Sequence, residues 1–283
     1  MPELPEVEYV ARQLREALVG ARFARVEVLW PRSVSRISPE DLAARLMGRR
    51  VLAVGRRAKY LVITLDNGES LVIHRRMSGN LRLARADEDA PYTRVVLTLS
   101  NGRRLLFTDP RKFGRITVVA PRELPELFDR LGPEPLDAEF TPDVLAERLA
   151  RRTRSIKALL LDQSVVAGLG NIYADEALFR AGIHPLRPAA TLTSEEITAL
   201  HAGIQGALRM GIEHGGTTFG RHRGLYDEPG SNLEHVQVYQ RTGQPCPHCG
   251  TPIARIRVAQ RSAHFCPRCQ PAPEGAAPET YAS

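Results

Sequence analysis

The chain has 283 residues, of which 43% are hydrophobic, so it is long enough for two domains with real cores and a small appendage. Its net charge of +7 fits a polyanionic partner, but it also fits plain solubility. No stretch is apolar for long enough to cross a bilayer, and the acidic first residues lack the apolar run of a secretory signal. These features argue against membrane and secreted classes, and we expect a cytoplasmic protein.

Residues 1–130 are predicted to form an antiparallel β-sandwich or barrel flanked by two helices. Apolar residues at helical spacing predict a helix over 6–19, and Ser38-Pro39 is typical of the start of a second one. Strand-like segments lie at 22–30, 51–56, 60–65, 70–75, 94–100, 103–108 and 115–120. Asp66-Asn67-Gly68 and Asn101-Gly102 are hairpin signals between such segments.

A Pro- and Gly-containing linker is predicted over 131–140, and helices are predicted to dominate 141–235. The expected helices span 141–151, 155–163, 171–182 and 194–213. Residues 215–235 contain several glycines and few apolar side chains, and we expect a mobile loop there. The composition of residues 271–283 predicts a disordered tail.

All four cysteines fall in the pattern Cys246-x2-Cys249-x16-Cys266-x2-Cys269. Two CxxC pairs at this separation can place four thiolates tetrahedrally around one Zn²⁺, and four sulfur ligands leave no open position for catalysis. The residues between the pairs suit a β-hairpin, so we expect a structural zinc ribbon over 236–270. Gln260-Arg261-Ser262 at its tip is a candidate phosphate contact, although an arginine on a hairpin is usually just solvated.

Three further loops carry features of nucleic-acid contact, although each alone also fits a packing role. Gly168-Leu169-Gly170-Asn171 precedes a helix, where free backbone N–H groups bind anions and Asn171 can act as a cap. Asp109-Pro110-Arg111-Lys112-Phe113-Gly114 presents two bases and an aromatic ring, and Met77 lies in a second basic loop. Apolar side chains in such loops can wedge between base pairs.

Lysine is rare in this chain: Lys59, Lys112 and Lys157 are the only lysines among 39 basic residues. Codon usage that favours arginine explains most of this bias. A lysine can nevertheless lose its proton and take part in proton transfer, which an arginine effectively cannot. The three lysines are therefore candidates for positions where an ammonium group matters.

The N-terminus offers an unusual nucleophile. A small residue such as Pro2 permits removal of Met1, which would expose a secondary amine able to form an iminium ion with a sugar aldehyde. An α-amino group titrates near ~8, below a lysine near ~10. Glu3 and Glu6 flank it. The plainer explanation is a frayed end with two acids that interact favourably with the helix dipole.

Taken together, these segments resemble formamidopyrimidine-DNA glycosylase, a bifunctional base-excision repair family that acts on oxidised purines. The resemblance covers residues 1 to about 270 and rests on six motifs in the family's order. They are Pro2-Glu3-Leu4-Pro5-Glu6-Val7-Glu8, Arg57-Ala58-Lys59-Tyr60-Leu61, Met77-Ser78-Gly79, Asp109-Pro110-Arg111-Lys112-Phe113-Gly114, Gly170-Asn171-Ile172-Tyr173-Ala174 and the zinc ribbon with Gln260-Arg261. It implies an α+β multidomain fold with a β-sandwich, a helical domain containing a helix–two-turn–helix motif, and a four-cysteine zinc ribbon.

The resemblance also implies catalytic roles. Pro2 attacks the anomeric carbon of the damaged nucleotide and forms the iminium, Glu3 is the acid that assists sugar opening and base loss, and Glu6 supports the site. Lys59 takes part in proton transfer during β-elimination, and Arg261 assists δ-elimination. The implied partner is double-stranded DNA with an oxidised purine (8-oxoguanine or a formamidopyrimidine) or an abasic site, bound by a monomer in the bacterial cytoplasm or nucleoid.

The same resemblance implies a set of DNA contacts. The residues concerned are Met77, Tyr92, Arg111, Phe113, Arg152, Lys157 and Asn171. Met77, Arg111 and Phe113 would fill the gap left by the flipped nucleotide, with Arg111 facing the orphaned cytosine. Two positions depart from the family pattern: Tyr92 stands where relatives often carry a histidine, and Arg75 stands where an apolar residue is commoner.

Two alternatives stay open at this point. An endonuclease VIII-like enzyme would share the fold and the N-terminal proline but prefer oxidised pyrimidines; Leu4 and the set of Met77, Arg111 and Phe113 argue against it. A non-catalytic zinc-ribbon protein that binds nucleic acid is the other, and the N-terminal motif argues against it. Residues 219–234 match the family weakly, so the sequence assigns no ranking among lesions.

Overall fold

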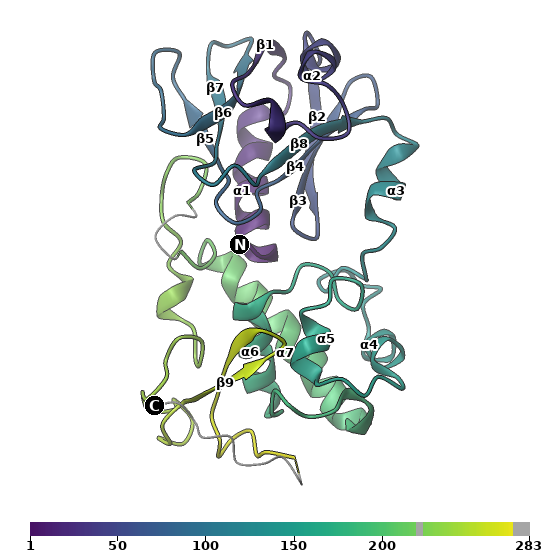
Figure 1. Ribbon diagram of the computed structural model, residues 1–283, viewed down its shortest axis with the longest axis vertical. Coiled ribbons are helices and arrows are strands. Elements are labelled where there is room, and N and C mark those ends of the chain that lie inside the picture. Colours follow the sequence, from purple (N-terminus) through teal and green to yellow (C-terminus); the bar gives the residue numbers. More distant parts are fainter. Residues whose placement is uncertain (219–222, 274–283) are drawn as a thin grey trace. The chain divides into compact units, whose positions relative to one another are not determined.

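The computed structural model describes residues 1–218 and 223–273, and the chain forms two compact units (Figure 1). The first unit comprises Met1–Asp129 and Gly211–Leu233, and the second comprises Arg130–Met210 and the chain from Glu234 onward. The finer boundaries expected from the sequence stay predictions. Part of the expected mobile loop (219–222) and most of the expected tail (274–283) lie outside the described residues.

Two four-stranded antiparallel sheets form the first unit, in the orders β1-β6-β7-β5 and β2-β3-β4-β8. The strands are β1 (Phe23–Val28), β2 (Val51–Arg57), β3 (Tyr60–Leu65), β4 (Ser70–His74), β5 (Asn80–Ala84), β6 (Thr93–Leu99), β7 (Arg104–Thr108) and β8 (Arg115–Val119). The predicted sandwich is therefore confirmed. The two hairpin signals join β3 to β4 and β6 to β7, as expected.

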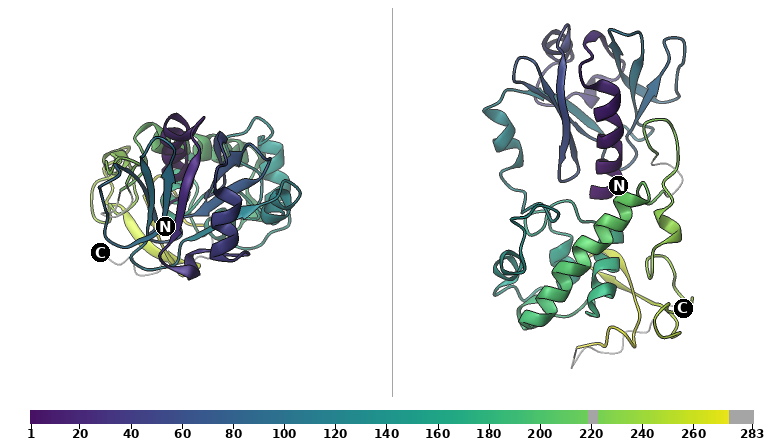
Figure 2. Two further views of the ribbon diagram at one scale, coloured as in Figure 1. Left: turned by 90° about the horizontal axis from the view of Figure 1, so that it is seen from above. Right: turned by 180° about the vertical axis from the view of Figure 1, so that it is seen from behind.

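Three α-helices accompany the sheets: α1 (Leu4–Leu18), α2 (Pro39–Leu46) and α3 (Glu123–Phe128), with a 3₁₀ turn at Pro31–Ser33. Helix α2 begins where its sequence predicts, because the Ser38 hydroxyl accepts the Asp41 N–H at 3.0 Å. Figure 2 shows α1 running along the strands of this unit. Helix α3 was not predicted; it is only six residues long, and Pro125 is tolerated in its first turn.

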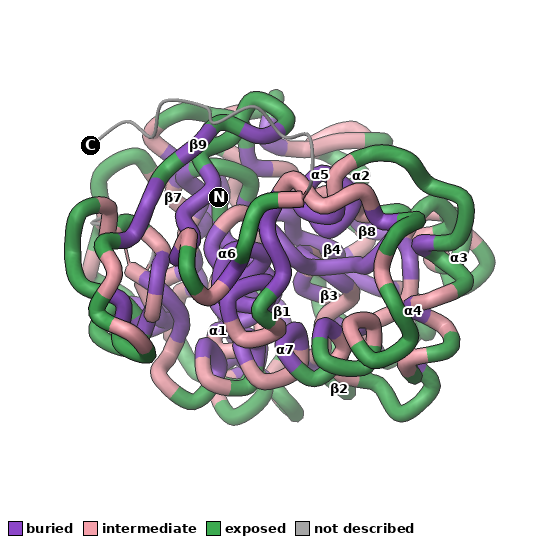
Figure 3. The backbone as a smooth tube through the Cα atoms, turned by 90° about the horizontal axis from the view of Figure 1, so that it is seen from below, coloured by how far each residue is buried: buried purple, intermediate pink, exposed green. Residues whose placement is uncertain are grey.

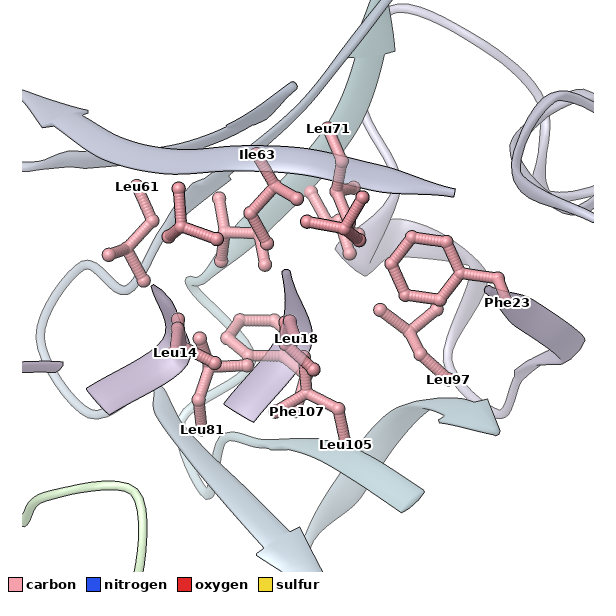
Figure 4. Close-up of a cluster of buried hydrophobic side chains, with 14 of the residues drawn as sticks. Leu14, Leu18, Phe23, Leu61, Ile63, Leu71, Leu81, Leu97, Leu105 and Phe107 are labelled. Atoms are coloured by element: carbon pink, nitrogen blue, oxygen red, sulfur yellow. The ribbon is translucent and has the colours of Figure 1, made fainter. Parts of the chain in front are cut away.

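The core of the first unit lies between the two sheets and includes the apolar face of α1. Figure 4 shows Leu14 and Leu18 beside Phe107, with Ile63 of the other sheet facing them. Strand β4 is buried at every residue, and Figure 3 draws it purple in the interior. Because α1 is anchored over its whole length in this way, its first turn is held in a defined position.

Strand β5 is the strand of this unit that the sequence did not predict. It is an edge strand that pairs only with β7 among the described strands, and Leu81 and Leu83 point into the core. Its sequence, Asn-Leu-Arg-Leu-Ala, contains good helix formers and no β-branched residue. Pairing and burial, rather than local preference, make it a strand.

The described part of the second unit contains α4 (Pro142–Leu149), α5 (Ile156–Leu160), α6 (Asn171–Ala181) and most of α7 (Ser194–Glu213), whose last turn belongs to the first unit. All four helices lie close to the predicted ranges. Strands β9 (Ala254–Val258) and β10 (Arg261–Phe265) form the predicted hairpin, and short 3₁₀ turns lie at Ala189–Thr191 and Asn232–Glu234. Helix α6 packs against β10 and α5. Within 1–218 and 223–273, none of the helices has the length and apolarity to cross a bilayer.

We predict that Phe107→Ala lowers the free energy of unfolding of the first unit by about 3–5 kcal/mol, because it removes a fully buried ring and leaves a cavity. Leu52→Ala is the matched control: its side chain is half exposed, so the loss should stay within roughly 0.5 kcal/mol. Urea unfolding followed by circular dichroism measures both. A Phe107→Ala loss as small as that of the control would contradict this description of the core.

Candidate functional site

The predicted nucleophile and its two acids lie at the start of α1: Pro2 and Glu3 precede the helix, and Glu6 lies in its first turn. Met1 is exposed, whereas Pro2 is buried and Glu3 is only 4% exposed. Glu3 is the N-cap residue with extended backbone, and Pro5 lies in the first turn, where a proline has no hydrogen bond to lose. The end of the chain is therefore packed in place and is not a frayed terminus.

The carboxylate of Glu6 ties this turn to a distant segment of the same unit. Its Oε2 accepts the Glu3 N–H and its Oε1 accepts the Thr217 N–H, both at 2.7 Å. Gly216 lies against Glu6 with a φ of +82°, and a Cβ there would come within 2.7 Å of the Glu6 Cγ. The structure therefore brings Pro2, Glu3 and Glu6 together and adds Thr217, for which the sequence carried no signal.

Lys59 lies in the two-residue turn of the β2–β3 hairpin and is 5% exposed. The turn requires a left-handed backbone at Ala58, with a φ of +51°. The Tyr60 ring meets the His74 ring edge-on at 4.4 Å between centroids. Lys59 thus lies in the turn close enough to the buried His74 imidazole for its charge to act on that ring. No role in the site had been assigned to His74 from the sequence.

The His74 imidazole is held neutral. Burial, together with the nearby charges of Arg76 and Lys59, lowers its pKa from 6.5 to about 3. Its Nδ1 accepts the Arg76 N–H at 3.0 Å, so the ring proton is on Nε2. A neutral ring of this kind donates one hydrogen bond without adding a charge.

A cavity of about 320 Å³ adjoins His74 and is rich in donors. Its lining includes Arg36, Tyr60, His74, Arg76, Arg115 and Thr117. The buried Thr117 hydroxyl has no hydrogen-bond partner in the part of the chain that the structure describes. Three guanidinium groups, an N–H donor and a hydroxyl suit an oxyanion such as a phosphodiester. The excess of arginine was the only hint of this in the sequence.

Asp109 joins the two loops that the sequence singled out as wedges. This residue is fully buried; its Oδ1 accepts the Ser78 hydroxyl and the Arg111 N–H (3.1 Å to the latter), and its Oδ2 accepts the Gly114 N–H at 2.6 Å. Met77 and Phe113 are left 38% and 46% exposed. The structure thus places both apolar tips on loops that one carboxylate holds.

Arg111 and Tyr92 belong to the same cluster. The Arg111 guanidinium lies over the Phe113 ring, 4.9 Å from its centroid. Tyr92 is exposed with a φ of +63°, and its carbonyl accepts the Asp109 N–H at 2.9 Å. It lines a cavity of about 350 Å³ together with Asn80, Arg82 and Arg223. Met77, Tyr92, Arg111 and Phe113 are therefore neighbours around Asp109, although three different loops supply them.

In the second unit, the glycine-rich turn leads directly into α6. Gly170 is the N-cap residue and Asn171 is the first helical residue, so the expectation that Asn171 caps the helix is wrong. Its buried Oδ1 accepts no hydrogen bond within the described residues. Asn171 lies next to the backbone N–H groups at the helix N-terminus, which can bind an anion.

Lys157 is placed differently from what the resemblance implied. Its side chain is fully buried, and its Nζ lies 2.6 Å from Asp175 Oδ1 and also donates to the Ser262 carbonyl. The second carboxylate oxygen, Oδ2, accepts the His264 N–H at 3.0 Å. An ammonium enclosed in this way has no surface for a phosphate, so we revise the expected DNA contact of Lys157. Through these contacts the Lys157 side chain links α5 to α6 and β10.

Arg152 and Arg261 are both exposed in the second unit. Arg152 follows α4, and its N–H bonds the Leu149 carbonyl at 3.1 Å. Arg261 is the first residue of β10, beside a tight turn in which Ala259 and Gln260 both have positive φ. The tip of the hairpin is therefore Ala259-Gln260, one residue earlier than predicted, and Arg261 stands on the strand.

The four cysteines converge as their spacing predicts. Their sulfur atoms all lie within 4.8 Å of one another, with Cys246–Cys269 at 3.9 Å and Cys249–Cys266 at 3.5 Å. Tetrahedral zinc with Zn–S bonds of about 2.3 Å needs sulfurs about 3.8 Å apart. The donor set and its spacing therefore fit one structural Zn²⁺.

The chain matches three family models along its length. The "Formamidopyrimidine-DNA glycosylase N-terminal domain" matches residues 1–116, the "Formamidopyrimidine-DNA glycosylase H2TH domain" matches 131–222, and the "Zinc finger found in FPG and IleRS" matches 243–272. The chain belongs to the formamidopyrimidine-DNA glycosylase family. The fold expected from the resemblance, with its sandwich, helical region and zinc finger, is thereby confirmed.

Individual relatives agree with this. The formamidopyrimidine-DNA glycosylase of Herpetosiphon aurantiacus is 53% identical over 95% of this chain and 100% of its own length. The Lactococcus lactis Fpg bound to DNA with an abasic site superposes with a TM-score of 0.89 at 36% identity, covering 95% of this chain and all of that one. MutM bound to DNA containing carbocyclic 8-oxo-G gives a TM-score of 0.88 at 37% identity, covering 96% of this chain and all of that one.

The neutral state of His74 leads to a pH prediction. Below pH 6.5 the unfolded chain protonates this imidazole, whereas the folded protein resists protonation down to about pH 3, so stability falls as the pH falls through that window. In His74→Asn, whose Oδ1 can still accept the Arg76 N–H, the free energy of unfolding should depend less on pH between about pH 4 and 6, by up to ~1.4 kcal/mol per unit. Urea titrations at several pH values measure the slope. Equal slopes in both proteins would contradict a buried neutral ring.

We also predict that Cys246→Ser reduces bound zinc from one ion per chain to well below one, because three thiolates hold the ion more weakly. Metal analysis of the purified protein measures this. Arg268→Ala is the control: Arg268 is an exposed ribbon residue that supplies no sulfur, and this variant should keep its zinc. Full zinc occupancy in Cys246→Ser would argue against a four-cysteine site.

Proposed function

We propose that this chain is a bifunctional DNA glycosylase and abasic-site lyase of base-excision repair. Its substrate is double-stranded DNA that carries an oxidised purine, such as 8-oxoguanine or a formamidopyrimidine, or an abasic site. The observation that carries the proposal is the packed N-terminus, where Pro2, Glu3 and Glu6 lie together at the start of α1. The solved complexes of relatives with abasic-site DNA and with DNA containing carbocyclic 8-oxo-G support it.

We assign the chemistry to the N-terminal turn. After removal of Met1, the Pro2 nitrogen attacks C1′ of the damaged nucleotide, the base leaves, and an iminium ion forms between Pro2 and the opened sugar. Glu3 supplies the proton for sugar opening and base loss. Glu6, whose two oxygens each accept a backbone N–H, keeps the turn in place rather than donating a proton.

Strand cleavage follows from the iminium, which acidifies C2′. Loss of a C2′ proton expels the 3′ phosphate in β-elimination, and we assign Lys59 to proton transfer at this step. A second elimination expels the 5′ phosphate, and Arg261 assists it by binding that group. The cavity beside His74 is a candidate site for a backbone phosphate of the same strand.

Recognition of the everted nucleotide is assigned to the cluster around Asp109. Met77, Arg111 and Phe113 fill the space in the stack, which offsets part of the cost of extrusion, roughly a few kcal/mol. Tyr92, Arg152 and Asn171 are proposed to contact the DNA backbone, whereas Lys157 is proposed to act structurally. The protein is proposed to act as a monomer in the bacterial cytoplasm or nucleoid, with one structural Zn²⁺.

Borohydride trapping tests the catalytic proposal. The wild-type protein, with loss of Met1 verified by mass spectrometry, should form a covalent adduct with duplexes that carry 8-oxoguanine opposite cytosine. Pro2→Glu should form none, because a large second residue retains Met1 and the secondary amine is absent. Pro5→Ala, which alters the same turn but not the nucleophile, should still form the adduct. Absence of an adduct from wild-type protein that begins at Pro2 would rule out the proposal.

Substrate comparison separates the proposal from its nearest alternative. An endonuclease VIII-like enzyme would process thymine glycol faster than 8-oxoguanine. We expect the opposite order for this chain, measured as single-turnover excision rates on duplexes of the same sequence. A faster reaction with thymine glycol would favour the alternative.

A further inference from the structure

Arg75 is the largest fully buried side chain of the described residues, at 1% exposure, and the function proposed above assigns it no part. Burial lowers the pKa of its guanidinium to about 10, and the charge of Glu6 opposes that shift, so the group stays charged at neutral pH. A buried charge is costly unless its donors are satisfied, so its acceptors show what it holds together.

Those acceptors come from three separate segments of the first unit. Nη1 donates to the Glu6 carbonyl on α1 at 3.2 Å. Nη2 donates to Asn80 Oδ1 at 2.5 Å and to the Arg223 carbonyl at 3.3 Å. Nε donates to the Gly79 carbonyl at 3.0 Å. The planar fork of an arginine can satisfy all of these acceptors at once, which neither lysine nor an apolar residue can do.

Arg75 also closes the loop that carries Met77. Its carbonyl accepts the Gly79 N–H at 2.9 Å while its side chain donates to the Gly79 carbonyl, so the two ends of the loop are joined in both directions. A Cβ on Gly79 would come within 2.4 Å of the Arg75 carbonyl oxygen, so this approach requires glycine. Arg76 turns the chain with a φ of +53°, and Met77 projects from the tip.

We propose that Arg75 is a positioning residue that holds the Met77 loop in register with the first turn of α1, so that the wedge and the nucleophile are presented together. This inference rests on the function proposed above. The guanidinium links the loop to the residue whose carboxylate holds Glu3 and Thr217. Met77 is therefore already ordered before DNA binds. The entropic cost of ordering it is then not added to the free energy needed to move the nucleotide out of the stack.

The proposal predicts an effect that depends on the substrate. Excision of 8-oxoguanine from a fully paired duplex requires extrusion and should need the ordered wedge. A single-stranded abasic site needs no extrusion, so its trapping should depend only on the N-terminal chemistry. A residue that merely stabilises the fold would affect both reactions alike.

Arg75→Leu is the decisive variant, because it removes every donor together with the buried guanidinium charge. We expect single-turnover excision of 8-oxoguanine opposite cytosine to fall roughly 10- to 100-fold. Borohydride trapping of single-stranded abasic DNA should stay within about twofold of wild type. The fluorescence of 2-aminopurine next to the lesion should show slower base eversion.

Arg45→Leu is the matched control. Arg45 also donates hydrogen bonds from both Nε and Nη2 and pairs with Glu69 at 2.6 Å, but on α2, away from these loops. This variant should show no difference between the two substrates. Arg75→Gln keeps two donors and should lie between wild type and Arg75→Leu; it is assayed in the same way if the leucine variant does not fold.

Equal losses on both substrates, or no loss on either, would overturn the positioning role. These outcomes differ from failure of the proposed function, in which the wild-type protein would form no adduct with any substrate.

Discussion

The two hydrogen bonds that the Glu6 carboxylate accepts from the backbone of Glu3 and Thr217 are the interactions on which the arrangement of the candidate site depends. Glu6 is buried, so each oxygen needs a donor, and removing either donor would leave a buried charge without a partner. Gly216, with its positive φ, allows the backbone to approach closely enough. The first turn of α1 and the segment around Thr217 are therefore held together by one residue, and Pro2 is packed beside them.

Buried carboxylates that accept hydrogen bonds from loop residues also order other parts of the chain. Asp109 accepts the Ser78 hydroxyl of one wedge loop and the N–H groups of Arg111 and Gly114 in the other, and so holds both loops. Glu176 in α6 accepts three successive N–H groups from Gln237 to Tyr239; burial raises its pKa, and these donors act in the opposite direction. A buried carboxylate that binds several N–H groups orders irregular backbone that has no sheet or helix partners. Within each unit, exposed functional residues are thus carried by loops with buried polar anchors.

The sequence predicted most of the regular structure because the strands alternate clearly and the turns carry glycine, asparagine or a capping serine. It missed β5, whose residues have no local preference for a strand, and α3, which is short and contains a proline. For the site, motif spacing predicted the zinc cluster, because two CxxC pairs at this separation can place four sulfurs around one ion. It did not predict the environment of Lys157, because whether a lysine reaches solvent or pairs with Asp175 depends on residues that are distant in the chain.

The sequence by itself determined which chemical groups are present and the order in which they occur: an N-terminal proline followed by acids, two CxxC pairs, basic loops with apolar tips, and few lysines. Only the tertiary structure decided which of them act together. It buried Lys157 and left Arg261 exposed, it held His74 neutral, and it made Arg75 a partner of Glu6, Gly79, Asn80 and Arg223. The physical reason is that the hydrogen-bonding and desolvation of a charged group depend on its neighbours in space, and a residue's own identity does not specify them.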